Sequence, residues 1–421
     1  MAAGVVGSEI LRIASEIRAL SAGGKDVCNL TVGDFGPSEF RVPKILEKAI
    51  GDALARGETN YPPSDGMPGL RQAVADFYAR TLGLRFPVQG ILITGGARPA
   101  IYGAYRAVLD PGDTVVYPVP SWNSNHYCHL AGARGVAVPC GPEEGFLPSA
   151  RGLAGPLRGA RLLALNSPLN PSGTAFAPEA LGEICDLVLE ENARRGRDER
   201  PLFVLYDQVY WMLTFGSTRH VEPVGLRPAM APFTIFVDGI SKPFAATGLR
   251  VGWAAGPPDL INRMSQMLGH VGAWAPRPEQ VATAALLADE AGVAAYRREM
   301  TAGVSGRLDA LYEGFVRLKS AGHPVEALCP AGAIYLAVRL DLIGRRTPDK
   351  TSLRSNEEIR LFLLREAGLA AVPFQAFGVP DDTGWFRLSV GAVSPAAIAR
   401  MLPRLRSALE SLESGPTRRD P

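Results

Sequence analysis

The sequence has almost no net charge, few cysteines and no long apolar run, and each absence excludes a class of protein. Its 44 lysines and arginines against 42 acidic residues leave a net charge of +2, which is not the charge footprint of a protein that binds nucleic acid or an anionic membrane. No segment reaches the roughly 18 consecutive apolar residues that a membrane span requires. Residues 1–24 carry acids within their apolar stretch and no cationic lead, which predicts that no secretory signal is present.

The cysteines are odd in number and scattered, with no C-x-x-C pair. The five positions are Cys28, Cys128, Cys140, Cys185 and Cys329. This usage argues against a disulfide framework and predicts a reduced protein of the cytoplasm. His126 and His129 form an H-x-x-H, but no third Cys, His or carboxylate clusters with them in the sequence. We therefore expect polar residues of a loop or helix there and no metal site.

Lysine is the scarcest of the common charged residues. The six positions are Lys25, Lys44, Lys48, Lys242, Lys319 and Lys350. Lys242 is the only lysine between Lys48 and Lys319, a long stretch that otherwise uses arginine. Exposed charge does not require an amine, because arginine pairs as well or better. Arginine cannot lose its proton near neutral pH and attack a carbonyl carbon, so Lys242 is a candidate covalent catalyst.

The pattern of apolar runs predicts an α/β fold. At 421 residues the chain is too long for one small core, and two or three lobes are expected. Short apolar runs that alternate with helical patterns predict a mostly parallel sheet between helices. The expected strands are residues 91–94, 114–117, 161–165, 202–206, 234–237 and 251–255. Helices are expected from Pro99, from Pro178 and over 293–322, and the last hundred residues mix strands and helices as an α+β lobe would.

Polar residues follow several of these strands, at the edge where open α/β sheets bind ligands. "GGARP" (95–99) opens the helix after the first strand, and "PVPSW" ends at Trp122. The next strands lead into Asn170, Asp207 and, through "DGISK", Lys242. Taken alone, each has a structural interpretation as a turn, a core residue or a helix cap. Together they form the parts of one chemical site.

That site suits pyridoxal 5'-phosphate. An amine holds the aldehyde as a Schiff base, which fits Lys242. A carboxylate keeps the pyridine nitrogen protonated, which fits Asp207. A phosphate takes backbone N–H groups at a helix N-terminus and a guanidinium, here "GGARP" and Arg250. Trp122 can stack on the ring. Donors to the phenolic oxygen are expected from Asn170 and Tyr210.

The chain resembles the class I aminotransferases of PLP fold type I, above all the aspartate aminotransferase-like branch. "SKPFAATGLRVGW" is similar to the family's S-K-x-x-x-x-x-G-x-R-x-G signature, and "NSPLNPSG" to its N-x-P-x-N-P-T/S-G loop. "YDQVY", "NYPPSDGMPGLRQAVADFY", "LTVGDFGPSEF" and "WFRLSVG" resemble further segments of the family. The resemblance covers nearly the whole chain.

The resemblance implies a large domain with a mostly parallel seven-stranded sheet between helices and a smaller α+β domain. It implies an N-terminal arm and part of the small domain over 1–60, a large PLP-binding domain over 61–290, and a linking helix and small domain over 291–421. The implied catalytic residues are Lys242, Asp207 and Tyr210. The implied cofactor-binding residues are Gly96, Ala97, Arg98, Trp122, Asn170, Asp207, Tyr210, Ser241, Lys242, Arg250 and, from the partner subunit of a homodimer, Tyr61. The implied substrate-binding residues are Gly33, Trp122, Asn170, Arg98 and Arg387, the last as a clamp for the α-carboxylate.

Transamination between an amino acid and a 2-oxo acid by a ping-pong cycle is the leading prediction. The alternative is other PLP chemistry on the same fold, such as a lyase, cyclase or oxidase of specialised metabolism, because those enzymes share the residues named above. The chain departs from many relatives at Gly239, where they carry a hydroxyl that binds phosphate. Arg98 occupies the place of a cation that contacts the distal carboxylate of the substrate in aspartate-specific relatives, and Arg277 is a second, weaker candidate. The alternatives for Arg98 are added charge at the phosphate or a solvent-facing side chain.

Overall fold

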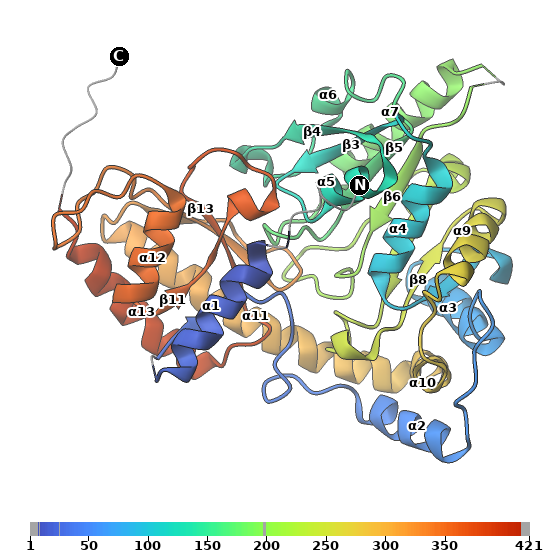
Figure 1. Ribbon diagram of the computed structural model, residues 1–421, viewed down its shortest axis with the longest axis horizontal. Helices are drawn as coiled ribbons and strands as arrows, with labels where there is room; N and C mark the ends of the chain where they lie inside the picture. Colours follow the sequence, from blue (N-terminus) through green and yellow to red (C-terminus); the bar gives the residue numbers. More distant parts are fainter. Residues whose placement is uncertain (1–6, 8, 25, 197–198, 414–421) are drawn as a thin grey trace.

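A seven-stranded sheet forms the centre of the larger part of the molecule (Figure 1). The computed structural model describes residues 7, 9–24, 26–196 and 199–413. In spatial order the strands are β2 (Ile91–Thr94), β8 (Gly252–Ala255), β7 (Thr234–Gly239), β6 (Phe203–Asp207), β5 (Leu162–Asn166), β3 (Thr114–Val119) and β4 (Arg134–Pro139). Neighbouring strands pair in parallel except at β8, which is antiparallel to both β2 and β7. The predicted α/β class and mostly parallel sheet are confirmed.

Helices cover both faces of this sheet. One face packs against α4 (Ala97–Val108), α5 (Ser124–Ala131) and α9 (Pro258–His270), and the other against α3 (Pro68–Thr81), α7 (Pro178–Arg194) and α10 (Arg277–Ala288). Successive strand residues alternate between the two apolar clusters. Leu162 and Leu205 belong to the first, and Leu163 and Val204 to the second. Burial on both faces explains why the central strands read as continuous apolar runs.

Two details of the large sheet differ from the prediction. The apolar pattern does not predict β4, because only Val138 among its six residues is buried at the edge of the sheet. Helix α4 begins at Ala97, two residues before the predicted start at Pro99. The backbone turns at Gly96, whose φ of 92° lies in the left-handed region. Pro99 then falls in the first turn, where its missing N–H breaks no intrahelical hydrogen bond.

A smaller α+β part contains a four-stranded antiparallel sheet, as predicted for the last hundred residues. Its strands, in spatial order, are β12 (Val372–Pro373), β13 (Trp385–Ser389), β10 (Tyr335–Leu340) and β9 (Val325–Ala327). The helices α12 (Asn356–Glu366) and α13 (Pro395–Glu410) belong to this part, and the long helix α11 (Glu290–Ser320) runs to it from the large sheet (Figure 1).

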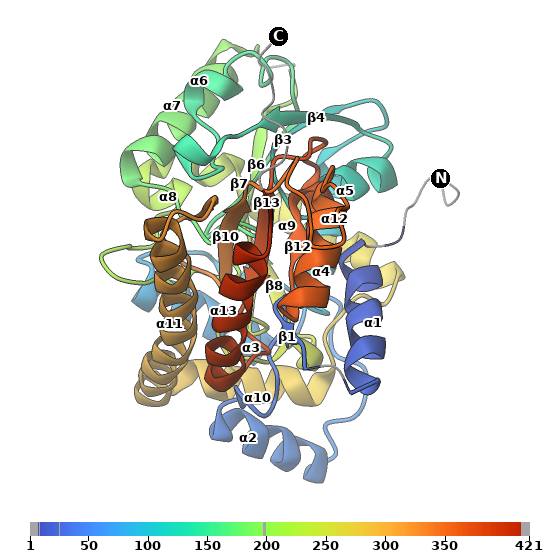
Figure 2. The same cartoon turned by 90° about the vertical axis from the view of Figure 1, so that its left-hand side faces the viewer.

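The N-terminal segment joins the smaller part through a two-stranded parallel pair, β1 (Cys28–Asn29) with β11 (Leu369–Ala370). The chain then continues beside β13, where the backbone N–H of Ser389 donates to the carbonyl of Leu30 and its hydroxyl donates to that of Val32. Figure 2 shows β1 beneath the strands of the smaller sheet. This pairing carries residues 31–34 toward the ends of the large sheet's strands.

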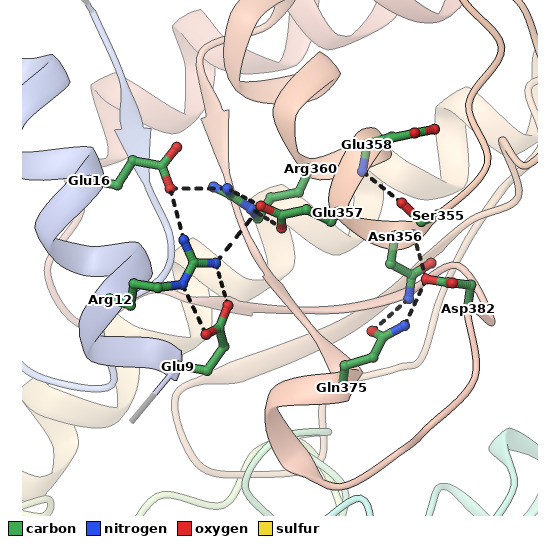
Figure 3. Close-up of polar contacts among 10 residues, drawn as sticks. All are labelled: Glu9, Arg12, Glu16, Ser355, Asn356, Glu357, Glu358, Arg360, Gln375 and Asp382. Atoms are coloured by element: carbon green, nitrogen blue, oxygen red, sulfur yellow. Dashed lines mark hydrogen bonds and ion pairs between the residues drawn. The ribbon is translucent and has the colours of Figure 1, made fainter. Parts of the chain in front are cut away.

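Ion pairs hold helix α1 (Glu9–Ala22) against α12 (Figure 3). Arg360 is 1% exposed and donates to both Glu357, at 2.7 Å, and Glu16, at 3.0 Å. Arg12 pairs with Glu9 and lies 3.8 Å from Glu357. The buried guanidinium therefore ties two segments that are far apart in the sequence.

The other helices are α2 (Lys44–Ala55), α6 (Ala150–Leu153) and α8 (Pro223–Leu226). Within the described residues, no helix combines the length and the apolar character that would let it cross a membrane.

Candidate active site

The carboxyl ends of β3, β5, β6 and β7 meet at one edge of the sheet, and a cavity of about 730 Å³ lies there. Side chains from α4, from the strand ends, from residues 32–34 and from β10 and β13 line it. Most of the predicted site residues are in its wall, namely Gly33, Ala97, Arg98, Trp122, Asn170, Asp207, Tyr210, Ser241, Lys242, Arg250 and Arg387. The volume lies in the range of small-molecule sites.

Lys242 lies three residues after the end of β7 and points its amine into this cavity. Its Nζ donates to the carbonyl oxygen of Gly33 at 2.5 Å and lies 5.8 Å from the centroid of the Tyr210 ring. Burial lowers the pKa of Lys242 to about 8; the carboxylate of Asp34 opposes this shift and the guanidinium of Arg387 adds to it. At pH 7 about a tenth of an amine with this pKa is unprotonated, far more than of an ordinary lysine, and the unprotonated form is the one that acts as a nucleophile or general base.

Asp207 is the last residue of β6 and lines the same cavity. Its Oδ1 accepts a hydrogen bond from the backbone N–H of Val209 at 3.2 Å. Burial raises the pKa of Asp207 to about 6, while the Val209 N–H and the charge of Lys242 oppose the shift. The side chain of Asn166 on β5 donates to the Asp207 carbonyl at 2.8 Å and fixes the end of the strand. Above pH 6 the half-buried carboxylate carries a negative charge that favours a cationic partner.

The first turn of α4 and Arg250 form a cradle for an anion. The guanidinium donates to the carbonyls of Thr247, at 2.7 Å, and Gly95, at 3.0 Å. A Cβ at Gly96 would lie 2.2 Å from Nη2 of Arg250, so this close approach requires glycine. The N–H groups at the start of α4 have no partner within the helix, and they point toward the same place. Ala97 and Ser241 line the cavity there.

Arg387 extends from β13 into the cavity and is 1% exposed. Its Nη1 donates to Oδ1 of Asn170 at 3.0 Å and its Nη2 to the carbonyl of Thr31 at 2.6 Å. The guanidinium carbon lies 4.7 Å from the ring centroid of Tyr335 and 4.9 Å from that of Phe377. Its Nε finds no acceptor among the described residues. A buried, planar guanidinium with unused N–H groups is suited to a carboxylate ligand.

Two residues of the site were not predicted. Tyr335 is the first residue of β10, and its hydroxyl is 2.5 Å from that of Tyr210. A Cβ at Gly33 would lie 2.7 Å from the Tyr335 hydroxyl, which explains the glycine there. Asp34 follows directly, lines the cavity and accepts a hydrogen bond from Thr247 at 2.5 Å. Its position beside Gly33 is the only sequence signal for its role.

Arg98 lies against Trp122 in the cavity wall. Its guanidinium carbon is 4.6 Å from the ring centroid, a cation–π distance. The polar stretch 123–129 forms the start of α5, and its residues Ser124 and Tyr127 also line the cavity. Arg98 is thus a cation on the wall of the cavity, held by an aromatic face.

Three predicted residues lie outside the cavity wall. Gly96 packs against the guanidinium of Arg250, as described above. Tyr61 is 82% exposed, and its ring packs edge-on against Trp274 with 5.7 Å between centroids. Arg277, the weaker candidate for substrate recognition, begins α10 and pairs with Glu58 at 2.6 Å.

A buried polar network lies on the face of the large sheet that packs against α3, α7 and α10. Asp238 Oδ2 accepts hydrogen bonds from Trp211 Nε1, at 2.7 Å, and from the Tyr78 hydroxyl, at 3.0 Å. The Tyr78 hydroxyl in turn accepts from Trp253, at 2.9 Å, and from Gln208, at 3.2 Å. Burial raises the pKa of Asp238 to about 8, against the effect of these donors.

This network anchors the segment that carries two candidate catalytic groups. Gln208 and Trp211 reach down into it, while their neighbours Asp207 and Tyr210 line the cavity above. The turn 207–211 is therefore held from below at two points.

Pyridoxal 5'-phosphate fits these residues. The cradle at Gly96 has a guanidinium that no carboxylate pairs with among the described residues, so it suits a phosphate. Asp207 is placed to pair with a ring nitrogen, and Lys242 offers an amine of lowered pKa to an aldehyde.

Comparison with known proteins shows one family that the sequence matches and several relatives to which the chain is similar. The profile of the family "Aminotransferase class I and II" matches residues 25–405. The aspartate aminotransferase of Rhizobium meliloti (strain 1021) is 30% identical over 408 residues, which are 96% of this chain and 94% of that protein. A crystal structure of the aspartate aminotransferase from Rhizobium meliloti superposes with a TM-score of 0.89 at 29% identity, covering 98% of each chain. The aromatic aminotransferase of Pyrococcus horikoshii OT3 gives a TM-score of 0.81 at 28% identity, covering 94% of this chain and 98% of that one.

The lowered pKa of Lys242 predicts that its amine reacts at lower pH than those of exposed lysines. We expect competitive labelling of the cofactor-free protein with acetic anhydride, read by mass spectrometry, to show half-maximal reactivity of Lys242 near pH 8. The amine is protonated and unreactive below that pH and free above it. Lysine in model peptides titrates at about 10.4. A midpoint for Lys242 at that pH would contradict the assignment.

Proposed function

The chain belongs to the class I and II aminotransferases, which use pyridoxal 5'-phosphate to move an amino group between an amino acid and a 2-oxo acid, and we propose that this member prefers an acidic amino donor. Other PLP chemistry on the same fold, the alternative from the sequence, is not favoured by these relatives. The observation that carries the substrate proposal is that, besides Arg250 of the phosphate cradle, two further guanidinium groups, Arg387 and Arg98, line the same cavity.

Each guanidinium has a distinct role in this proposal. Arg387 binds the α-carboxylate, supported by its burial, its unpaired Nε and the orientation that Asn170 gives to its fork. Arg98 binds a second carboxylate on the substrate side chain, supported by its place in the wall against Trp122. Arg387 is buried and Arg98 is exposed at the cavity wall, and two cations on one wall favour a dicarboxylate over a neutral side chain of the same size.

The chain's own residues then position and move the proton. Bound pyridoxal 5'-phosphate supplies an aldehyde that takes the amino group and a ring that accepts the electrons of the Cα–H bond. Lys242, as the free base, removes the proton from the substrate's α-carbon. Asp207 would hold the ring nitrogen of the bound cofactor and stabilise positive charge there. Tyr210, whose hydroxyl is oriented by Tyr335, is a donor at the cavity wall.

We also propose that the protein is a homodimer in which Tyr61 completes the phosphate cradle of the partner subunit. Its 82% exposed ring lies beside Trp274, and the 65% exposed Val271 belongs to the same loop as that tryptophan. The loop contacts the cradle, because the Gly95 N–H donates to the carbonyl of Ala273 at 2.8 Å. Exposed apolar groups beside a ligand site are what a second copy would cover.

A cytoplasmic location remains a prediction, and the five unpaired cysteines of the described chain support it.

Replacing Arg98 by glutamine tests the substrate proposal. A charge-assisted hydrogen bond is worth about 1.5–3 kcal/mol, so kcat/KM for aspartate or glutamate should fall by about tenfold to a hundredfold on Arg98→Gln. A neutral or aromatic donor should change much less. Arg406→Gln, which removes a surface charge paired with Glu410, is the matched control, and Arg277→Gln tests the weaker candidate. If wild-type protein accepts no dicarboxylate in a screen of amino donors against 2-oxoglutarate but accepts a basic or unusual amino acid, Arg98 does not set specificity.

Mixing two inactive variants tests the shared site. If Tyr61 acts on the partner subunit, a heterodimer of Tyr61→Phe and Lys242→Ala chains has one doubly altered site and one intact site. Random pairing would then restore roughly a quarter of the wild-type activity. The two variants assayed separately give the baseline, and gel filtration of each confirms a dimer. A monomer at assay concentration, or a mixture no more active than the mean of its parents, would contradict the proposal.

A further inference from the structure

A second hollow of about 820 Å³ lies away from the candidate active site and shares no lining residue with it. Its walls are the end of α3, the segment 211–219 that follows β6, and the first half of α11. Figure 1 shows α11 leading from this region of the large sheet toward the smaller part. The indole of Trp211, which is 3% exposed and hydrogen-bonded to Asp238, forms part of its wall.

Positive charge is concentrated around this hollow. Four arginines and a single carboxylate, Glu290, are among its lining residues, although the whole chain is nearly neutral. Glu290 is already paired with Arg80 at 3.1 Å, and Arg80 also donates to the carbonyl of Leu287. Arg219, Arg297 and Arg298 therefore give the hollow an excess of three positive charges.

Arg297 is the most constrained of these cations. Its Nε donates to the carbonyl of Met212 at 3.1 Å, and its guanidinium carbon lies 5.7 Å from the centroid of the Trp211 ring. Burial lowers the pKa of Arg297, and the charge of Arg219 adds to the effect. No carboxylate within the described residues pairs with Arg297 or with its neighbour Arg298. Bringing several cations together around a partly desolvated guanidinium costs free energy that a bound anion would offset.

Neutral donors complete the lining. The hydroxyl-bearing residues in the wall are Thr81, Thr214, Thr301 and Ser305. The hydroxyls of Thr81 and Ser305 already donate to backbone carbonyls of their own helices, so Thr214 and Thr301 are the candidates to donate to a ligand. Guanidinium forks bind phosphoryl oxygens in pairs, and hydroxyl groups can occupy the oxygens that remain. The volume is far larger than an inorganic phosphate needs, so it can hold the organic part of a ligand as well.

We propose that this hollow is a binding site for a small phosphorylated metabolite, held by Arg297, Arg298 and Arg219. The phosphoryl group lies between the guanidinium groups, and the organic part lies along the α11 wall, where Ala294 and Ala302 are exposed. The site is separate from the phosphate cradle at Arg250, so it does not depend on the proposed substrate.

Calorimetric titration of the cofactor-loaded protein tests this directly, because its phosphate cradle is then filled. Inorganic phosphate and pyrophosphate are the probes, and ionic strength is held constant with chloride. We expect saturable binding of one anion per chain, tighter for pyrophosphate. Arg297→Gln and Arg298→Gln should each weaken it by about tenfold or more, since each removes a charge-assisted contact. Arg317→Gln lies on the same helix, pairs with Glu313 outside the hollow and should bind as the wild type does.

A second measurement locates the bound anion. The chain has five tryptophans, so fluorotryptophan labelling gives five ¹⁹F signals, which single Trp→Phe substitutions assign. Pyrophosphate should shift the Trp211 signal most. Arg298→Gln and Arg219→Gln keep the test valid if Arg297→Gln does not fold, because those side chains are exposed. Absence of saturable binding, binding that an Arg219→Gln/Arg298→Gln double variant leaves unchanged, or a shift confined to Trp122 would overturn the proposal.

Discussion

The structure depends on the cost of burying an amine. An ammonium removed from water is destabilised unless it is paired, and among the described residues Lys242, three residues after β7, has a backbone carbonyl as its only hydrogen-bond partner. Its pKa falls to about 8 for that reason. The surrounding charges are arranged around this amine, with carboxylates at Asp34 and Asp207 and cations at Arg98 and Arg387. The cavity lies where the parallel strands of the large sheet end together, and residues of the smaller α+β part complete its lining.

The turn after β6 has residues in the cavity and residues in a buried hydrogen-bond network, and the network fixes the turn. Neighbouring residues of the turn after β6 point in opposite directions. Asp207 and Tyr210 line the cavity, and Gln208 and Trp211 enter the buried network around Asp238. A catalytic carboxylate on a flexible loop would lose its orientation. The Asp207 carboxylate accepts the Val209 N–H, and the network anchors the neighbouring Gln208 and Trp211. Trp211 also forms a wall of the arginine-lined hollow, so the same turn separates two candidate anion sites.

Most of the sheet and much of the site follow from the sequence because both have local signals. Central strands buried on both faces are continuous apolar runs, whereas the edge strand β4 is exposed and was missed. Lys242, Asp207 and Arg250 follow strands or match a motif. Tyr335 and Asp238 have no such signal, since one contacts Tyr210 and the other Tyr78 only through the tertiary fold. The role of Tyr61 depends on a second chain, which a single sequence does not place.

Replacing Lys242 by arginine and by alanine tests the central claim most directly, because arginine keeps the positive charge but cannot become a free base near neutral pH. Both purified proteins should fold, and the cofactor absorbance that borohydride fixes to the wild-type chain should be lost. Transamination should fall by several orders of magnitude in both, with no advantage for Lys242→Arg. Turnover by either variant within about tenfold of the wild type, which corresponds to roughly 1.4 kcal/mol in the barrier, would contradict the account.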